Sequence, residues 1–225
     1  MYRPLSPRKL QRLQERCWAT FERAVADTLL QAYQQPHRKY HTLSHIEELL
    51  RGFDAQAWRH PRAVEWAVWF HDVVYETTAD AYANNETASA GWVLQLLVPG
   101  ADQDMPAWER DCDLARRLVL ATQSHRATAW EFAPDELEDA QRFLDLDLAV
   151  LAQPWSQVLA FDAAIRQEFS QYTEEQFAQG RSQALRSLEA GTVFQGPKAT
   201  ELEPLAQENL RKLTVQWEAR LSARS

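Results

Sequence analysis

The sequence is poor in glycine, in cysteine and in positive charge. Its six glycines form neither a glycine-rich phosphate loop nor a Gly-x-Ser-x-Gly elbow, which argues against two common kinds of nucleotide-binding and hydrolytic site. Its two cysteines, Cys17 and Cys112, are too few for a disulfide framework and too far apart for a zinc knuckle. The first residues lack the apolar core of a secretory signal. We therefore expect a protein of the reducing cytoplasm.

Long apolar runs are also missing, and none approaches the roughly 18 residues that a membrane span requires. The formal net charge of −8 argues against general nucleic-acid binding, which usually accompanies a basic surplus. A small phosphorylated ligand held by a few local cations stays compatible with this charge. The 225 residues, 45% hydrophobic and 25% charged, predict one domain over residues 1–225.

Apolar residues recur at three- and four-residue steps, and no convincing alternating strand appears. The clearest stripe covers residues 7–35 and ends at Pro36. A second helix is expected over 42–53, and a third begins at Pro61 and runs into His71. Further periodic segments, separated by proline or glycine, lie at 86–97, 107–124, 135–151, 155–169, 174–189 and 203–221. Residues 77–85 are polar and predict a loop or a short helix start. The fold prediction is an all-α, single-domain helical bundle.

His71 and Asp72 are the first candidate site residues, because they follow the apolar run Ala67-Val-Trp-Phe70 directly. Neighbouring positions of a helix diverge by about 100°, so adjacent residues share one target only near a helix end or kink. A lone His-Asp pair is more often a hydrogen-bonded structural pair than a metal site. The rest of the chain must therefore decide between the two.

Three more histidines are candidates. His41 and His45 stand four residues apart and would lie close to one face of a helix that begins near Thr42. Neutral imidazole is a good ligand for divalent metals, but the two histidines alone favour a capping or core-edge pair. His125 continues the stripe of Leu114, Leu118 and Ala121 and should face inward. A buried, hydrogen-bonded histidine is an equally good interpretation of His125.

Asp147 is the most informative carboxylate. Its neighbours at three and four residues are all large and apolar, namely Phe143, Leu144, Val150 and Leu151. Burying an unpaired carboxylate costs several kcal/mol, so Asp147 needs a metal, an arginine or a histidine as partner. The corresponding neighbours of Asp145 are more polar, and we expect Asp145 on the solvent side or as a capping residue.

The order His45, His71-Asp72 and Asp147 on an all-helical chain resembles the HD superfamily of metal-dependent phosphohydrolases. More narrowly, four segments are similar to a bacterial branch of predicted HD phosphohydrolases: Tyr40-His41-Thr-Leu-Ser-His45-Ile, Phe70-His71-Asp72-Val-Val-Tyr75, Asn85-Glu86-x-x-Ser89-Ala90 and Asp145-Leu-Asp147-Leu. Gly180-Arg181 and Glu203-x-x-Ala206-x-x-Asn209-Leu210 fit the same branch. The likeness covers most of the chain, and the motifs are specific jointly rather than singly.

The resemblance implies that His45, His71, Asp72 and Asp147 bind one divalent metal ion. The mixed nitrogen and oxygen set suits manganese, iron, cobalt, nickel or zinc, and magnesium is an alternative. The metal would polarise a phosphoryl oxygen and make a water nucleophilic near neutral pH, with Asp72 counted among the catalytic residues. The step from His41 to His45 is similar to a pattern of cyclic-nucleotide phosphodiesterases, in which the first histidine donates a proton. By that analogy His41 protonates the leaving oxygen.

The resemblance indicates the roles of the remaining polar residues less directly. Glu86 is a candidate base or orients a ligand, and a carboxylate that stabilises a helix N-terminus is an equal alternative. His125 is a candidate for contact with phosphate or with a second metal. Arg38 and Lys39 are candidate phosphate-binding residues, although a solvated basic turn is favoured for them. Arg166 and Arg181 are weaker phosphate candidates.

The function implied is hydrolysis of a small-molecule phosphate ester, with a nucleotide as one substrate class. One alternative is a regulatory module that binds metal or nucleotide without efficient catalysis. The other is an HD-type iron oxygenase, which needs ligands for a second iron. Trp66, Trp69 and Trp92 lie in apolar helical runs and are expected in the core rather than stacked on a nucleobase. The sequence predicts no particular oligomeric state.

Overall fold

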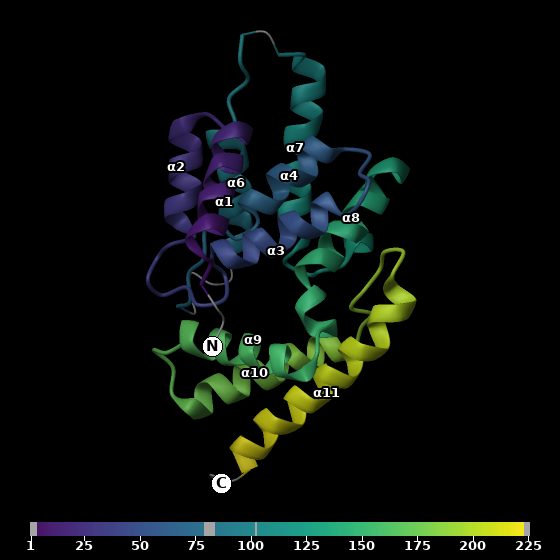
Figure 1. Ribbon diagram of the computed structural model, residues 1–225. Coiled ribbons are helices and arrows are strands. Elements are labelled where there is room, and N and C mark those ends of the chain that lie inside the picture. The colour runs from purple at the N-terminus through teal and green to yellow at the C-terminus, as the bar shows by residue number, and fades with distance from the viewer. Residues whose placement is uncertain (1–3, 79–83, 102, 223–225) are drawn as a thin grey trace.

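The computed structural model describes residues 4–78, 84–101 and 103–222, and its regular structure there is entirely helical (Figure 1). The helices are α1 (Pro7–Thr20), α2 (Arg23–Ala32), α3 (Leu43–Asp54), α4 (Pro61–Phe70), α6 (Asn85–Leu96), α7 (Met105–Ala121), η1 (Ala127–Ala129), α8 (Pro134–Asp147), η2 (Ala149–Ala152), α9 (Trp155–Glu168), α10 (Glu174–Glu189) and α11 (Ala199–Ser222). The all-α prediction is confirmed. None of the helices described is both long and apolar enough to cross a membrane. The predicted polar loop at 77–85 falls largely outside these ranges, since residues 79–83 are not described.

Residues 7–32 form two helices, not the single helix over 7–35 that the periodicity predicts. The chain is extended at Phe21, which ends α1, and α2 begins at Arg23. The cause is tertiary packing. The ring of Phe21 lies edge-on to those of Trp69 and Phe70, at centroid distances of 6.3 and 5.8 Å. No proline or glycine marks this break, so the sequence pattern did not reveal it.

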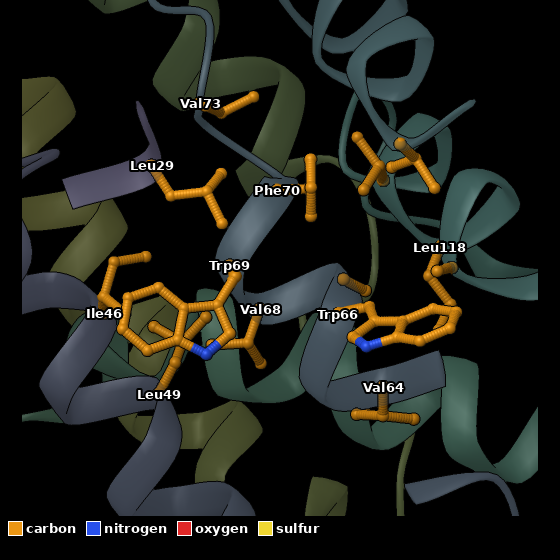
Figure 2. Close-up of a cluster of buried hydrophobic side chains, with 14 of the residues drawn as sticks. Leu29, Ile46, Leu49, Val64, Trp66, Val68, Trp69, Phe70, Val73 and Leu118 are labelled. Atoms are coloured by element: carbon orange, nitrogen blue, oxygen red, sulfur yellow. The ribbon is translucent and has the colours of Figure 1, made fainter. Parts of the chain in front are cut away.

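Helix α4 lies at the centre of the first hydrophobic core (Figure 2), to which α1, α2, α3, α6, α7 and α8 also contribute. It packs against α3, α6, α7 and α8, and every residue from Trp66 to Phe70 is buried. Trp66 and Trp69 are buried, and Trp92 packs against the core half-buried, as predicted. Because the last five residues of α4 are all buried, its last turn delivers His71 into the interior at a fixed position.

A second hydrophobic cluster joins η2, α9, α10 and α11 beneath the first group of helices in Figure 1. Asn209 ties α11 to the η2 turn by donating to the carbonyls of Leu151 and Gln153. Glu203 accepts the backbone N–H groups of Val193 and Phe194. The Glu-x-x-Ala-x-x-Asn segment of α11 therefore holds the η2 turn and the loop at Val193 and Phe194 in place.

The two groups of helices meet along a seam. Tyr40 precedes α3 in the first group but packs in the second hydrophobic cluster. Helix α8 ends at Asp147, four residues earlier than predicted, and η2 follows it. A cavity of about 660 Å³ lies at this seam, and several of the candidate side chains line it, namely His41, Asp72, Glu86, His125, Asp147 and Arg181.

Candidate functional site

The His71-Asp72 pair lies at the end of α4, as two adjacent residues with one target require. His71 is the C-terminal cap of the helix, and its N–H bonds to the carbonyl of Ala67. Arg38 donates to the carbonyls of Asp72 and Val73 and holds the chain in its turn there. As a result, Nε2 of His71 and Oδ2 of Asp72 lie 2.9 Å apart.

His45, in the first turns of α3, completes a compact group with this pair. Its Nε2 atom lies 3.2 Å from Nε2 of His71 and 4.0 Å from Oδ2 of Asp72. Nδ1 of His71 faces the carbonyl of Val68 at 3.0 Å, so a neutral His71 donates there and presents its Nε2 lone pair inward. Ligand atoms about 2.1 Å from one metal stand roughly 3.0–3.4 Å apart at octahedral or tetrahedral angles. Two of the three distances in this group are close to that range, and the 4.0 Å between His45 and Asp72 is longer. All three ligand atoms still lie near enough to one another to hold a metal ion.

Asp147 reaches the same group from the end of α8. Its Oδ1 atom lies 3.1 Å from Nε2 of His45 and 3.6 Å from Nε2 of His71, and its side chain is 12% exposed. Oδ2 lies 2.9 Å from Nε2 of His125. The inward direction predicted for Asp147 is thus the direction that the structure shows, with histidines as its partners.

His125 follows the turn that ends α7 and has a positive φ of 50°. This backbone conformation is uncommon outside glycine and turns the residue toward α8. Gln195 holds the turn: its amide donates to the carbonyl of His125 and accepts the N–H of Ala127. The contact between His125 and Asp147 therefore depends on a loop about 70 residues further along the chain.

Asp145 corrects the sequence-based expectation. It is buried rather than on the solvent side, with 9% exposure. It accepts the backbone N–H groups of Gln195 and Gly196 at 2.8 and 2.9 Å. The two aspartates of the segment thus have different contacts: Asp147 faces the histidines, and Asp145 anchors the loop that supports His125.

The charges of the group are strongly coupled. Burial alone would lower the pKa of His71, but Asp72 and Asp147 outweigh it and raise the pKa to about 9. Burial raises the pKa of Asp147, yet His71, His125 and His45 hold it well below its ordinary value. The pKa of Asp72 is lowered in the same way, chiefly by His71 and His41 against burial. Without metal, the group therefore keeps a proton on His71, and a cation has to displace that proton.

His41 lies beside this group and is held by Glu168 from the end of α9. Nδ1 of His41 lies 2.8 Å from Oε2 of Glu168, and Nε2 lies 3.9 Å from Oδ2 of Asp72. The rings of His41 and His45 are 6.0 Å apart, although only His45 lies within α3. Burial lowers the pKa of His41, but Glu168 and Asp72 outweigh it and raise the pKa.

Glu168 is the residue that the sequence analysis missed. Its Oε1 atom accepts the backbone N–H groups of residues 39, 40 and 41, and its Oε2 also accepts the hydroxyl of Tyr75. Despite burial, which raises it, its pKa falls to about 2 because of His41 and these N–H groups. A signal was available: Glu168 follows Ala164 and Ile165 on the apolar face of its helix, as Asp147 does on its own.

Glu86 lines the seam cavity near the start of α6. Its neighbours in the motif position it: Asn85 exchanges two hydrogen bonds with the backbone of Glu76, and Ser89 exchanges two with that of Val74. Burial raises the pKa of Glu86, and the nearby carboxylates of Asp72 and Asp147 raise it further. Such a carboxylate is a better proton acceptor than an ordinary surface glutamate.

Three of the four basic residues that are candidates for phosphate binding do not line the seam cavity. Arg38 is buried and donates to Gln35 and to three backbone carbonyls, and Nζ of exposed Lys39 donates to the carbonyl of Pro36. Arg166 bonds to Glu174 and to two carbonyls. Of these four candidates, only Arg181 is among the residues that line the seam cavity, where the exposed Arg126 joins it.

No protein-family model matches the chain, and no curated protein matches it. Among solved structures, the chain is similar to the phosphodiesterase domain of Salpingoeca rosetta rhodopsin phosphodiesterase. The superposition has a TM-score of 0.58 and covers 94% of this chain and 88% of that domain, with 12% sequence identity. The two proteins share a helical fold. Membership of the HD superfamily stays a prediction from the motifs.

Proposed function

We propose that this protein is a metal-dependent hydrolase of small-molecule phosphate esters. The observation that carries the proposal is a compact His45-His71-Asp72 group whose Asp72 lines the seam cavity beside His41, a histidine held by a buried glutamate. The shared fold with a protein named as a phosphodiesterase domain supports it by analogy. A module that only binds metal has no need of a second, separately oriented histidine.

In this proposal His45, His71, Asp72 and Asp147 hold one divalent cation. The donor set of two imidazoles and two carboxylates suits manganese, iron, cobalt, nickel or zinc, with magnesium as an alternative. When bound, such a cation polarises a phosphoryl oxygen and lowers the pKa of a water. His125 holds Asp147 in position from outside the group.

His41 protonates the leaving oxygen in the proposed reaction. Because its Nδ1–H donates to Glu168, its second proton sits on Nε2, which faces Asp72 and the cavity. Glu168 and Asp72 raise the pKa of His41, which favours the protonated ring that a general acid requires. Asp72 lies between the metal-ligand group and the proposed acid, since the same Oδ2 atom faces His71 and His41.

Glu86 accepts a proton from the attacking water in this scheme, and its raised pKa suits that role. For the phosphate contact we assign Arg126 and His125, which line the cavity, in place of Arg38 and Lys39. The guanidinium of Arg38 is hydrogen-bonded to the backbone beside Asp72, so its contribution to the site is to hold that backbone.

The test combines metal analysis with phosphate release from a panel of nucleotides and other esters. His45→Ala should lose metal and activity together. His41→Ala should keep the metal while turnover falls roughly 10²–10⁴-fold, and the deficit should shrink for nitrophenyl esters, whose leaving group needs little protonation. A metal-loaded protein with no turnover of any ester would refute the proposal in favour of a regulatory module. Two irons per chain with a visible chromophore would favour the oxygenase.

A further inference from the structure

His41, Asp72, Glu86, His125 and Asp147 line the polar end of the seam cavity. The cavity also has an apolar wall, which the binding of a phosphate group does not require. Helices α9 and α10 and the η2 turn supply it, with Leu148, Leu151, Phe161, Ile165, Leu185 and Leu188 among the lining residues. A volume of about 660 Å³ is in the range of ligand sites that enclose most of a small molecule. If the polar end binds phosphate, this wall covers the organic part of the substrate.

Arg181 of α10 is the basic residue set in that wall. Its Nε–H donates to Oδ1 of Asp162 at 2.8 Å, and its guanidinium lies over the ring of Phe161 at 5.3 Å. Nη2 is buried and has no hydrogen-bond partner among the described residues. A buried N–H group without a partner costs free energy and therefore needs an explanation. A ligand acceptor in the cavity would satisfy the guanidinium.

The charge of Arg181 is already balanced by Asp162, which is buried and also accepts Nε1–H of Trp217 at 2.8 Å. The pair therefore places a guanidinium with an unpartnered N–H group at the cavity wall without a net positive charge. An uncharged acceptor, such as a ring carbonyl, suits this environment better than a second anion, which would face Asp162 as well.

Aromatic contacts connect this position to the metal-ligand group. The ring of Phe161 beneath Arg181 lies 4.6 Å from that of Tyr40, and Tyr40 lies 4.8 Å from the ring of His45. A single small molecule can thus contact Arg181 while its phosphate lies at the polar end of the same cavity.

We propose that Arg181 selects the substrate by donating to an uncharged carbonyl-type acceptor on its organic part. The substrate class is then a phosphate ester of an apolar ring alcohol that carries such an acceptor. This inference rests on the proposed function for the placement of the phosphate. The donor site on Arg181 does not require turnover, so binding measurements test it separately.

The probes are two flat bicyclic esters of similar size, 4-methylumbelliferyl phosphate, which has a ring carbonyl, and 1-naphthyl phosphate, which has none. Binding of both is measured by calorimetry on chelator-treated protein, and kcat/KM is measured on metal-loaded protein. The wild type should prefer the carbonyl ester by roughly tenfold in both, the contribution of one hydrogen bond from a charged donor. Arg181→Lys keeps a cation beside Asp162 but loses the planar fork, so the preference should fall to within about twofold.

Arg186→Lys is the matched control, since Arg186 lies in the same helix and pairs with Glu218 on the surface. It should retain the wild-type preference. A preference in binding that Arg181→Lys abolishes, without hydrolysis of either ester, would support the inference and refute the phosphohydrolase proposal. Hydrolysis of both esters with no preference in the wild type, an unchanged preference in Arg181→Lys, or no binding of either ester would overturn the inference about Arg181.

Discussion

Replacing Glu168 by glutamine tests the arrangement that orients His41. The substitution keeps one oxygen for the backbone N–H groups of residues 39–41, which Oε1 of Glu168 now accepts. It places an NH₂ group where Oε2 accepts from Nδ1 of His41 and from the hydroxyl of Tyr75. Nδ1 of His41 must then become an acceptor, and the ring loses the partner that stabilises its second proton.

The magnitude follows from the pKa of Glu168, which is lowered from 4.5 to about 2. At about 1.4 kcal/mol per pKa unit, the ionised carboxylate contributes roughly 3 kcal/mol to the free energy of unfolding. Because the folded pKa is the lower one, this contribution is complete above the unfolded value near 4.5. It is lost as the pH falls through about 2. The wild type and Glu168→Gln should therefore differ most near neutral pH, and the difference should narrow in acid.

The assay is urea unfolding followed by circular dichroism at neutral and acidic pH, together with the pH dependence of ester hydrolysis. Loss of the carboxylate should also lower the pKa of His41, so the fall in activity on the alkaline side should move to lower pH. Glu208→Gln is the control, because Glu208 is exposed and its pair with Lys212 should be worth little. A Glu168→Gln variant as stable as the wild type at neutral pH, with an unchanged pH profile, would refute our account of His41.

Three further outcomes are expected. Asp147→Asn should weaken metal binding at least tenfold by calorimetry, as expected for loss of a ligand, and wild-type affinity in this variant would remove Asp147 from the set. Asp145→Asn should leave metal affinity within a few-fold but lower the free energy of unfolding by about 1–3 kcal/mol, because two half-buried backbone N–H groups lose a charged acceptor. Since His71 carries a proton below about pH 9 in the metal-free protein, apparent metal affinity should rise with pH and level off near 9; a pH-independent affinity between 6 and 8 would contradict this.

The sequence by itself determined that the fold is helical. It also determined where two parts of the candidate metal group lie, the His71-Asp72 pair and Asp147. Apolar periodicity is a local property, and the prolines that open α4 and α8 are local as well. The adjacency of His71 and Asp72 required a helix end, and α4 ends there. The apolar neighbours of Asp147 fixed its direction, because residues three and four apart share a helix face.

Tertiary structure decided which partners those side chains meet. The break at Phe21 arises from rings some 50 residues away, and the carboxylate that orients His41 lies 127 residues further along the chain. Asp145 has polar helical neighbours, yet a loop from beyond α10 covers it and uses it as an acceptor. Neighbours on one helix report the direction of a side chain, whereas burial and hydrogen-bond partners depend on which distant segment packs over it. That packing is settled by the whole core and leaves no local pattern.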